Sequence, residues 1–224
     1  MKKLTLLLLA SAFMLFACTN EKKDDKTAGT KTEEKDKTKK DPCEGYVADT
    51  TAAAPMDSVM MVAWMASATP GEMHKMLAMS DGDWEGEVTH WMDPAAPAKT
   101  SKTWATNRMI LGGRFQQSEH SGCFDGMSFE GISLVGYDNL KKVFMSTWID
   151  NMGTTVMHME GAWDAATKTI HMTGTCTNPM DGKQMNVRED FVIVDDNTQK
   201  MTMYGPDMKG KEFKTMEIVY KRKK

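Results

Sequence analysis

The chain has 224 residues with a formal net charge of -3 at pH 7, and 23 of its residues are methionine. This length is enough for one domain with a sizeable core, and the slight acidic excess argues against nucleic acid as a partner. Beyond the first residues, no segment is long and apolar enough to cross a membrane as a helix.

The N-terminus has the pattern of a bacterial lipoprotein signal. A basic start precedes an apolar run from Leu4 to Phe16, which is shorter than a membrane-spanning helix. Leu15-Phe16-Ala17-Cys18 resembles a lipobox, in which the cysteine thiol is acylated with palmitate-type chains after cleavage. We therefore expect residues 1–17 to be a signal peptide and the lipid on Cys18 to hold the protein at a membrane. An ordinary cleaved signal is the alternative.

The residues after Cys18 predict a disordered tether over 18–54. They are dense in Lys, Asp, Glu and Thr and contain too few large apolar residues to offset the entropy cost of ordering. Thr19, rather than Asp, after the cysteine resembles the sorting signal for the outer membrane of an envelope of the Gram-negative type. Whether the protein faces the periplasm or the cell surface is left open.

Three further cysteines are expected to lie in an oxidising compartment. Cys43, Cys123 and Cys176 allow one disulfide and one odd thiol. Cys123 with Cys176 is the expected pair, because Cys43 lies at the edge of the tether. The spacing lacks the paired CxxC pattern of a zinc site.

The domain over 55–224 opens with helical signals. Asp57 or Ser58 can cap a first short helix, and the segment Thr69–Glu72 supplies a cap, a proline and an acidic residue for a second. From Trp84 onward the apolar residues alternate with polar ones instead.

The alternating segment predicts about ten short antiparallel strands, separated by residues typical of turns. Even spacing without intervening helices favours an all-β up-and-down barrel or a sandwich over a parallel α/β sheet. Gly82-Asp83-Trp84 resembles the opening of lipocalin-like and fatty-acid-binding-like barrels, in which the tryptophan plugs the barrel floor. We therefore expect an up-and-down barrel of about ten strands after one or two short helices. The turns are expected at Asp93-Pro94, Leu111–Gly113, Asp125-Gly126, Asp138-Asn139, Asn151–Gly153, Asp164–Thr167, Asn178–Gly182, Asp195–Asn197 and Gly205-Pro206.

Six segments spread over the domain carry a family resemblance. They are Pro70–Leu77, Ala105–Phe115, Phe129–Ser133, Gly136–Asn139, Ser146–Gly153 and Met203–Asp207. Together they resemble the bacterial envelope family called domain of unknown function 1579. The resemblance implies a lipocalin-like barrel and no particular activity.

One hairpin decides how to interpret a cluster of His and Met residues at 156–174. A turn over Asp164–Lys168, with Lys168 at positive φ, would place Trp163 opposite Ile170. Because side chains alternate between the faces of a strand, Met157 and Met159 would then face the interior. His158 and His171 would face solvent, so the methionines and histidines would not form one metal site.

Metal binding stays open as an alternative function. Outward His158, Glu160 and His171 could hold a divalent ion, although a solvated strand face is the simpler interpretation. Inward methionines could hold Cu(I). The simpler interpretation is again structural, because only four leucines follow the signal against 21 methionines, so methionine fills ordinary core positions.

A methionine-lined barrel has an adaptable interior suited to a small apolar or amphiphilic ligand. Glu189 should face inward, with Arg114 as its expected partner, and such a pair could instead only tie the barrel together. His74, His90 and His120 are expected to be solvated. The candidate ligand-binding residues are Arg114, Gln116, Trp148, Met157, Met159, Glu189 and Met203.

No motif indicates catalysis. The sequence lacks a Gly-x-Ser-x-Gly elbow, a His-Glu-x-x-His helix and a phosphate-binding glycine loop, so we expect no enzyme, no cofactor and no resident metal. A lipid-anchored barrel that binds a small ligand is the preferred function. The alternatives are a methionine-rich copper-handling protein and a packed structural or interaction module without a ligand.

Overall fold

The structure is a computed structural model that describes Val47 and residues 57–224. The predictions for the signal peptide, Cys18, the tether and Cys43 concern residues outside this range.

Two short helices precede the barrel, as predicted. Helix α1 spans Ser58–Ala68, and the Asp57 side chain caps it by accepting a hydrogen bond of 2.7 Å from the Met60 N–H. Helix α2 spans Glu72–Ala78, and the Gly71 N–H donates to Nδ1 of His74 at 3.0 Å. Thr69 does not cap α2, because its N–H bonds to the Met65 carbonyl and it ends α1 instead.

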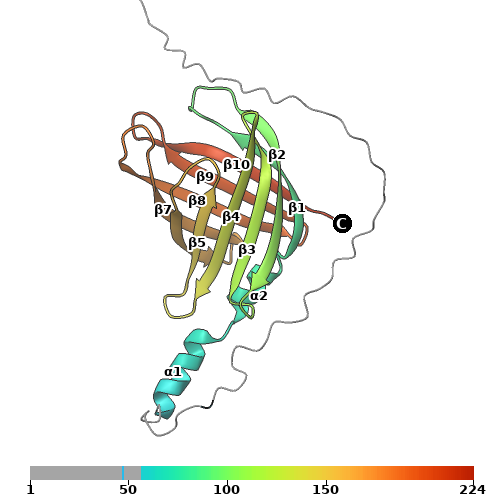
Figure 1. Cartoon of the computed structure of the whole chain (residues 1–224), viewed down its shortest axis with the longest axis vertical. Coiled ribbons are helices and arrows are strands. Elements are labelled where there is room, and N and C mark those ends of the chain that lie inside the picture. The colour runs from blue at the N-terminus through green and yellow to red at the C-terminus, as the bar shows by residue number, and fades with distance from the viewer. Residues whose placement is uncertain (1–46, 48–56) are drawn as a thin grey trace, which may run out of the picture. The chain divides into compact units, whose positions relative to one another are not determined.

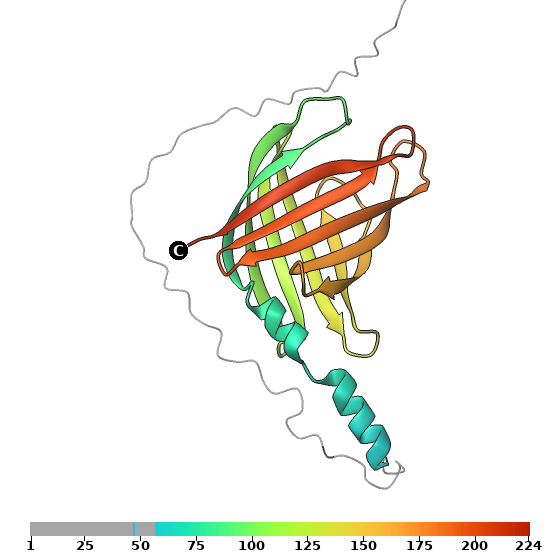
Figure 2. The ribbon, with the colours of Figure 1, turned by 180° about the vertical axis from the view of Figure 1, so that it is seen from behind.

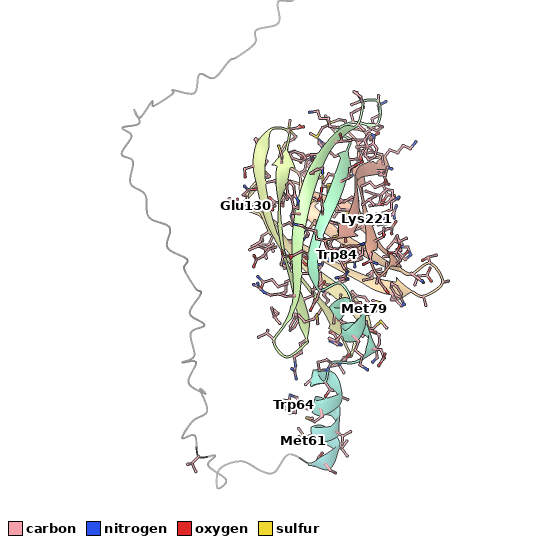
Figure 3. All side chains as sticks on the ribbon, turned by 90° about the vertical axis from the view of Figure 1, so that its right-hand side faces the viewer. Met61, Trp64, Met79, Trp84, Glu130 and Lys221 are labelled. Atoms are coloured by element: carbon pink, nitrogen blue, oxygen red, sulfur yellow. The ribbon has the colours of Figure 1, made fainter. Side chains whose placement is uncertain are left out.

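Helix α1 leaves apolar side chains exposed all round. None of its residues is buried, and the side chains of Val59 and Trp64 are 75% and 57% exposed. Figure 3 shows Met61 and Trp64 projecting from this helix. The Asn139 side-chain amide donates to the carbonyls of Ser67 and Thr69 at 3.1 and 2.8 Å, so polar contacts rather than apolar packing hold the end of α1. Among the described residues, neither helix combines the length and apolar character needed to traverse a bilayer.

Ten antiparallel strands form a closed barrel, which confirms the predicted fold. Each strand pairs with the next one in the chain, and β1 pairs with β10 to close the sheet (Figures 1 and 2). Closure leaves no strand edge unpaired. The strands are β1 Gly82–His90, β2 Lys99–Ile110, β3 Phe115–Phe124, β4 Met127–Asp138, β5 Val143–Asp150, β6 Met157–Asp164, β7 Thr169–Thr177, β8 Gln184–Asp195, β9 Thr198–Pro206 and β10 Glu212–Arg222.

The predicted turns separate the strands with one exception. Gly205-Pro206 belongs to β9, where Gly205 pairs with Phe213 and Pro206 with Glu212. The turn lies at the following residues, where the Asp207 N–H donates to the Lys211 carbonyl at 2.8 Å. Pro206 is the last residue of β9, so the Gly-Pro pair marks the end of this strand rather than the turn itself.

One end of the barrel is closed by α2 and Trp84. The Trp84 side chain is 1% exposed, and its indole N–H donates to the Ser80 carbonyl at 2.9 Å. The Gln199 amide donates to Oγ of Ser80 at 2.6 Å, and the Arg222 guanidinium lies 4.3 Å from the Trp84 ring. The prediction that this tryptophan plugs the floor is therefore confirmed.

Replacement of Trp84 by Ala should destabilise the barrel strongly. Loss of a fully buried aromatic side chain costs about 3–5 kcal/mol, and here the floor also loses its contacts with Ser80 and Arg222. Trp104→Ala is the matched control, because Trp104 lies on the adjacent strand and is 42% exposed. Its free energy of unfolding should change by less than about 1 kcal/mol. Urea unfolding of both variants measures this difference. Equal losses in the free energy of unfolding would contradict the role of Trp84 as the plug of the barrel floor.

Candidate functional site: a cavity inside the barrel

The barrel encloses a cavity of about 500 Å³. Residues from all ten strands and from α2 line it. It extends from Trp84 and Leu77 at the closed end to Met152 and Thr155 of the β5–β6 connection at the other. A volume of this size is typical of sites for small molecules.

The lining of the cavity differs between its two sides. Strands β2 to β5 contribute mostly polar groups, whereas β7 to β10 contribute mostly thioethers, branched aliphatic groups and an aromatic ring. A molecule held between these walls would meet hydrogen-bonding groups on one side and an apolar surface on the other. The polar group comprises Ser101, Thr103, Ser118, His120, Ser133 and Ser146, and the apolar group Ile170, Met172, Phe191, Met201, Met203, Met216 and Ile218.

Five of the seven candidate ligand-binding residues line this cavity. They are Gln116, Trp148, Met157, Glu189 and Met203.

The other two candidates do not border the cavity. Arg114 is exposed in the β2–β3 turn, and its guanidinium donates to the Leu111 carbonyl at 3.1 Å. Strand β3 begins only at Phe115, so the alternation of side chains along a strand does not apply to Arg114. Arg114 therefore neither faces the interior nor lies beside Glu189. Met159 faces inward as predicted, but it is packed in the core with Leu77 and Phe144.

Gln116 has a structural role that the sequence did not reveal. Its amide donates to the Leu77 carbonyl at 2.6 Å and to Oδ1 of Asp81 at 3.0 Å. Leu77 lies in the last turn of α2 and Asp81 between α2 and β1, and residues 77–81 form the floor segment. Gln116 therefore ties the floor segment to β3 while bordering the cavity.

Trp148 occupies a space that a glycine provides. A Cβ on Gly131 of the adjacent strand would lie 2.5 Å from the Trp148 ring, so only glycine fits beneath it. The indole N–H donates to Oδ2 of Asp150 at 2.7 Å, and the ring is stacked with Phe129 at 6.1 Å between centroids. Trp148 is thus a fixed aromatic surface in the cavity.

Glu189 is the unusual group of the cavity. It lies in the middle of β8, paired with Met172 on β7 and Met203 on β9. The Glu189 side chain lies inside the barrel and is only partly accessible, and it borders the cavity. Burial, with a contribution from the negative charge of Asp190, raises the pKa of Glu189 to about 7. No described basic group opposes this shift, and so the predicted pairing with Arg114 is wrong.

His120 and Tyr220 are cavity residues that the sequence analysis missed. The Tyr220 hydroxyl lies 3.5 Å from Nδ1 of His120, and the His120 and Trp148 rings are 5.1 Å apart between centroids. Burial lowers the pKa of His120 to about 4, so its ring is neutral at pH 7. Burial, followed by the charge of Glu189, raises the pKa of Tyr220. Alternation along β3 from Gln116 would have placed His120 inside.

The other two histidines expected in solvent are also buried. His74 packs edge-on against the Tyr137 ring at 6.0 Å, and burial is the main cause of its lowered pKa. His90 stacks on Phe124 at 4.7 Å, and its Nε2 lies 3.5 Å from the Asp125 carboxylate without hydrogen-bond geometry. Both lie at inward positions, where packing against aromatic rings replaces hydration.

The hairpin over β6 and β7 has the predicted register. Lys168 has a φ of 53°, and Trp163 pairs with Ile170. His158 and His171 are both exposed, and His171 bonds to the Asp190 carboxylate at 2.6 Å. The histidines therefore lie on the face opposite Met157. Within residues 57–224, no three His, Cys, Asp or Glu side chains converge in a way that could hold a metal ion.

Cys123 and Cys176 are free thiols, so the predicted disulfide is wrong. Cys123 lies on β3 and Cys176 on β7, with β4, β5 and β6 between them in the sheet. Both border the cavity, but the curvature of the barrel separates their strands. Burial raises the pKa of the Cys176 thiol.

These features define a closed up-and-down β-barrel with an internal, two-sided cavity. Residues 69–222 match the family described as protein of unknown function (DUF1579), and the chain belongs to that family. This confirms the resemblance that its sequence motifs carry.

A solved structure shares the fold. The chain is similar to the crystal structure of Rv2717c from M. tuberculosis, with a TM-score of 0.54 and 10% sequence identity over 70% of this chain and 100% of that one. At this identity the likeness concerns the fold alone. No curated protein matches the chain.

Replacement of Glu189 by Gln should stabilise the protein at alkaline pH. Because the pKa of Glu189 is about 7 in the fold and 4.5 ordinarily, the folded state binds the proton more tightly than the unfolded chain. The wild type therefore loses stability as the pH rises from about 4.5 through 7. On going from pH 5 to pH 8, the free energy of unfolding of Glu189→Gln should rise by about 2 kcal/mol relative to that of the wild type. This is somewhat less than the full pKa shift implies, because the group borders a cavity.

Urea unfolding at the two pH values measures this difference. Glu160→Gln is the control, because Glu160 lies on the outer face of β6 and its side chain is 56% exposed. A Glu189→Gln variant whose stability followed the wild-type pH profile would show that the carboxyl has another partner.

Proposed function

We propose that this protein is a lipid-anchored envelope protein whose barrel binds one small apolar or amphiphilic molecule without transforming it. The observation that carries the ligand-binding part is the cavity of about 500 Å³ with one polar and one apolar wall. A barrel that served only as a packed module would fill this space with its own side chains, since protein interiors are normally close-packed.

The composition of the apolar wall supports a ligand of loosely defined shape. Met172, Met201, Met203 and Met216 are unbranched and polarizable, so this wall can adapt to different apolar groups. The serine and threonine hydroxyls opposite can orient a polar group of the ligand.

Substitutions that fill the cavity should weaken the binding of a neutral apolar probe. N-phenyl-1-naphthylamine, whose fluorescence increases in apolar surroundings, should bind the wild type. Ser146→Phe or Ser133→Phe adds an aromatic ring at an inward position and should weaken binding by about tenfold or more, since space for the probe is lost. Ile149→Phe is the matched control, because Ile149 lies on the same strand as Ser146 but is 42% exposed on the outside.

Fluorescence titration measures the affinities of the wild type and the three variants, with thermal melting to verify folding. Unchanged binding by folded variants of both serines would contradict a ligand site in the cavity.

The membrane part of the proposal rests on the lipobox sequence and is supported by α1. This helix carries no charged residue and exposes apolar side chains on every face, a pattern typical of a helix that is buried in apolar surroundings, such as those of a lipid bilayer. Its 11 residues are too few to span a bilayer. A lipid on Cys18 together with α1 would give the two membrane contacts that stable anchoring requires.

Replacement of Cys18 by Ala should release the protein from the membrane fraction of its host. Without the thiol no acyl chain can be attached, and α1 alone gives only weak, reversible binding. Fractionation and intact-mass measurement of the full-length protein check this. A mature wild-type protein without an acyl mass would contradict the anchor.

A further inference from the structure

Among the described residues, no basic group and no hydrogen-bond donor pairs with the Glu189 carboxyl. Inside the sheet its neighbours across the strands are Met172 and Met203, neither of which can donate a hydrogen bond. The adjacent Asp190 faces outward and bonds to His171 and Arg188. A carboxyl group buried among thioethers without a donor or a cation is costly, unless a ligand supplies the partner.

The other titratable groups that border the cavity do not supply a free positive charge. Lys102 pairs with Glu85 and its side chain is 66% exposed. His120 is neutral at pH 7, and Tyr220 is kept in its neutral phenol form. Cys123 and Cys176 carry no positive charge in either protonation state.

The second carboxylate of the cavity already has partners. Oδ2 of Asp150 accepts from the Trp148 indole at 2.7 Å, and Oδ1 accepts from the Met152 N–H at 2.9 Å. The described lining holds no arginine. The interior is therefore negative or neutral, and Glu189 is the acidic group left to bind a ligand.

Aromatic rings from both walls, on β3, β4, β5 and β10, also border the cavity. Trp148 stacks with Phe129 at 6.1 Å, and His120 lies 6.4 Å from Tyr220 between ring centroids. Aromatic faces attract organic cations through their quadrupole, most strongly for Trp and Tyr. A carboxylate and aromatic rings around an apolar cavity are the groups that recognise an ammonium attached to a hydrocarbon.

We propose that the ligand of this cavity is an amphiphilic amine, whose ammonium group pairs with Glu189 and whose hydrocarbon part lies against the methionine wall. This inference rests on the proposed ligand-binding function and names the chemical class of the ligand. The hydroxyls of the polar wall and the aromatic rings would complete the shell around the ammonium.

Three probes with the same hydrocarbon chain separate the head-group preference from general apolar binding. Decylamine, decanol and decanoate are titrated against the complex of the full chain with N-phenyl-1-naphthylamine at pH 8. Decylamine should displace the probe at concentrations about tenfold or more below those of the other two, because only its charge complements Glu189.

Two variants assign the preference to Glu189. In Glu189→Gln the three decyl probes should bind within about threefold of one another, because the negative charge is lost while the cavity keeps its shape. Glu160→Gln removes an exposed carboxylate from the outer face and should keep the wild-type preference. Thermal melting verifies that both variants fold.

The pH dependence provides an independent readout. A group whose pKa is about 7 is about one-tenth ionised at pH 6 and nine-tenths ionised at pH 8. The affinity of the wild type for decylamine should therefore increase by up to about tenfold between these values, while that for decanol should stay constant.

The outcomes distinguish this inference from the proposed function. Equal displacement by the three probes, or an amine preference that persists in Glu189→Gln, would overturn the assignment of the ligand class and leave binding in the cavity intact. Failure of N-phenyl-1-naphthylamine itself to bind the wild type would overturn the proposed ligand-binding function.

Discussion

The pairing of β1 with β10 is the constraint on which the other features depend. It runs from Trp84 opposite Arg222 to His90 opposite Met216 and converts a ten-stranded sheet into a closed barrel. Once the sheet is closed, alternate residues of every strand must face one interior. Ten strands make this interior wider than facing side chains can fill along its whole length. Trp84, α2 and the core around Phe144 and Met159 fill part of the interior, and the cavity occupies space that they leave.

The same constraint explains why the interior has two chemically different walls. Each wall consists of successive strands, so the inward serines that β2, β3, β4 and β5 each contribute become part of one polar surface. The inward methionines of β7, β9 and β10 become part of an apolar one. Neither wall is visible in any single strand. The difference arises because neighbouring strands in the sequence are also neighbours in the barrel.

Glu189 illustrates how a functional group can oppose stability. Its carboxyl interrupts the apolar wall, and both burial and Asp190 disfavour its ionised form. A polar core residue without a partner is a local conflict between sequence and fold, and such conflicts concentrate at functional sites. Glu189 differs in this from Gln116, which lies on the opposite wall but has two acceptors in the floor segment.

Local sequence was sufficient where a feature depends on a few neighbouring residues. The turn at Asp164–Lys168 fixed the register of one hairpin, and this correctly separated His158 and His171 from Met157. Alternation along β8 also placed Glu189 inside correctly, because this pattern needs no distant contact. The prediction for Arg114 failed because Arg114 lies in a turn, where alternation does not apply. The prediction for His120 failed because its polarity suggested solvent, although its position on the strand is inward.

The sequence by itself thus determined the all-β class, the number of strands, the family and the face on which most strand residues lie, because these follow from turn chemistry and from a period of two. Only the tertiary structure decided that Cys123 and Cys176 remain apart, that Glu189 has no partner among the described residues and that a cavity persists. Each of these depends on distances between strands far apart in the chain, and closure of the sheet, rather than any local pattern, sets those distances.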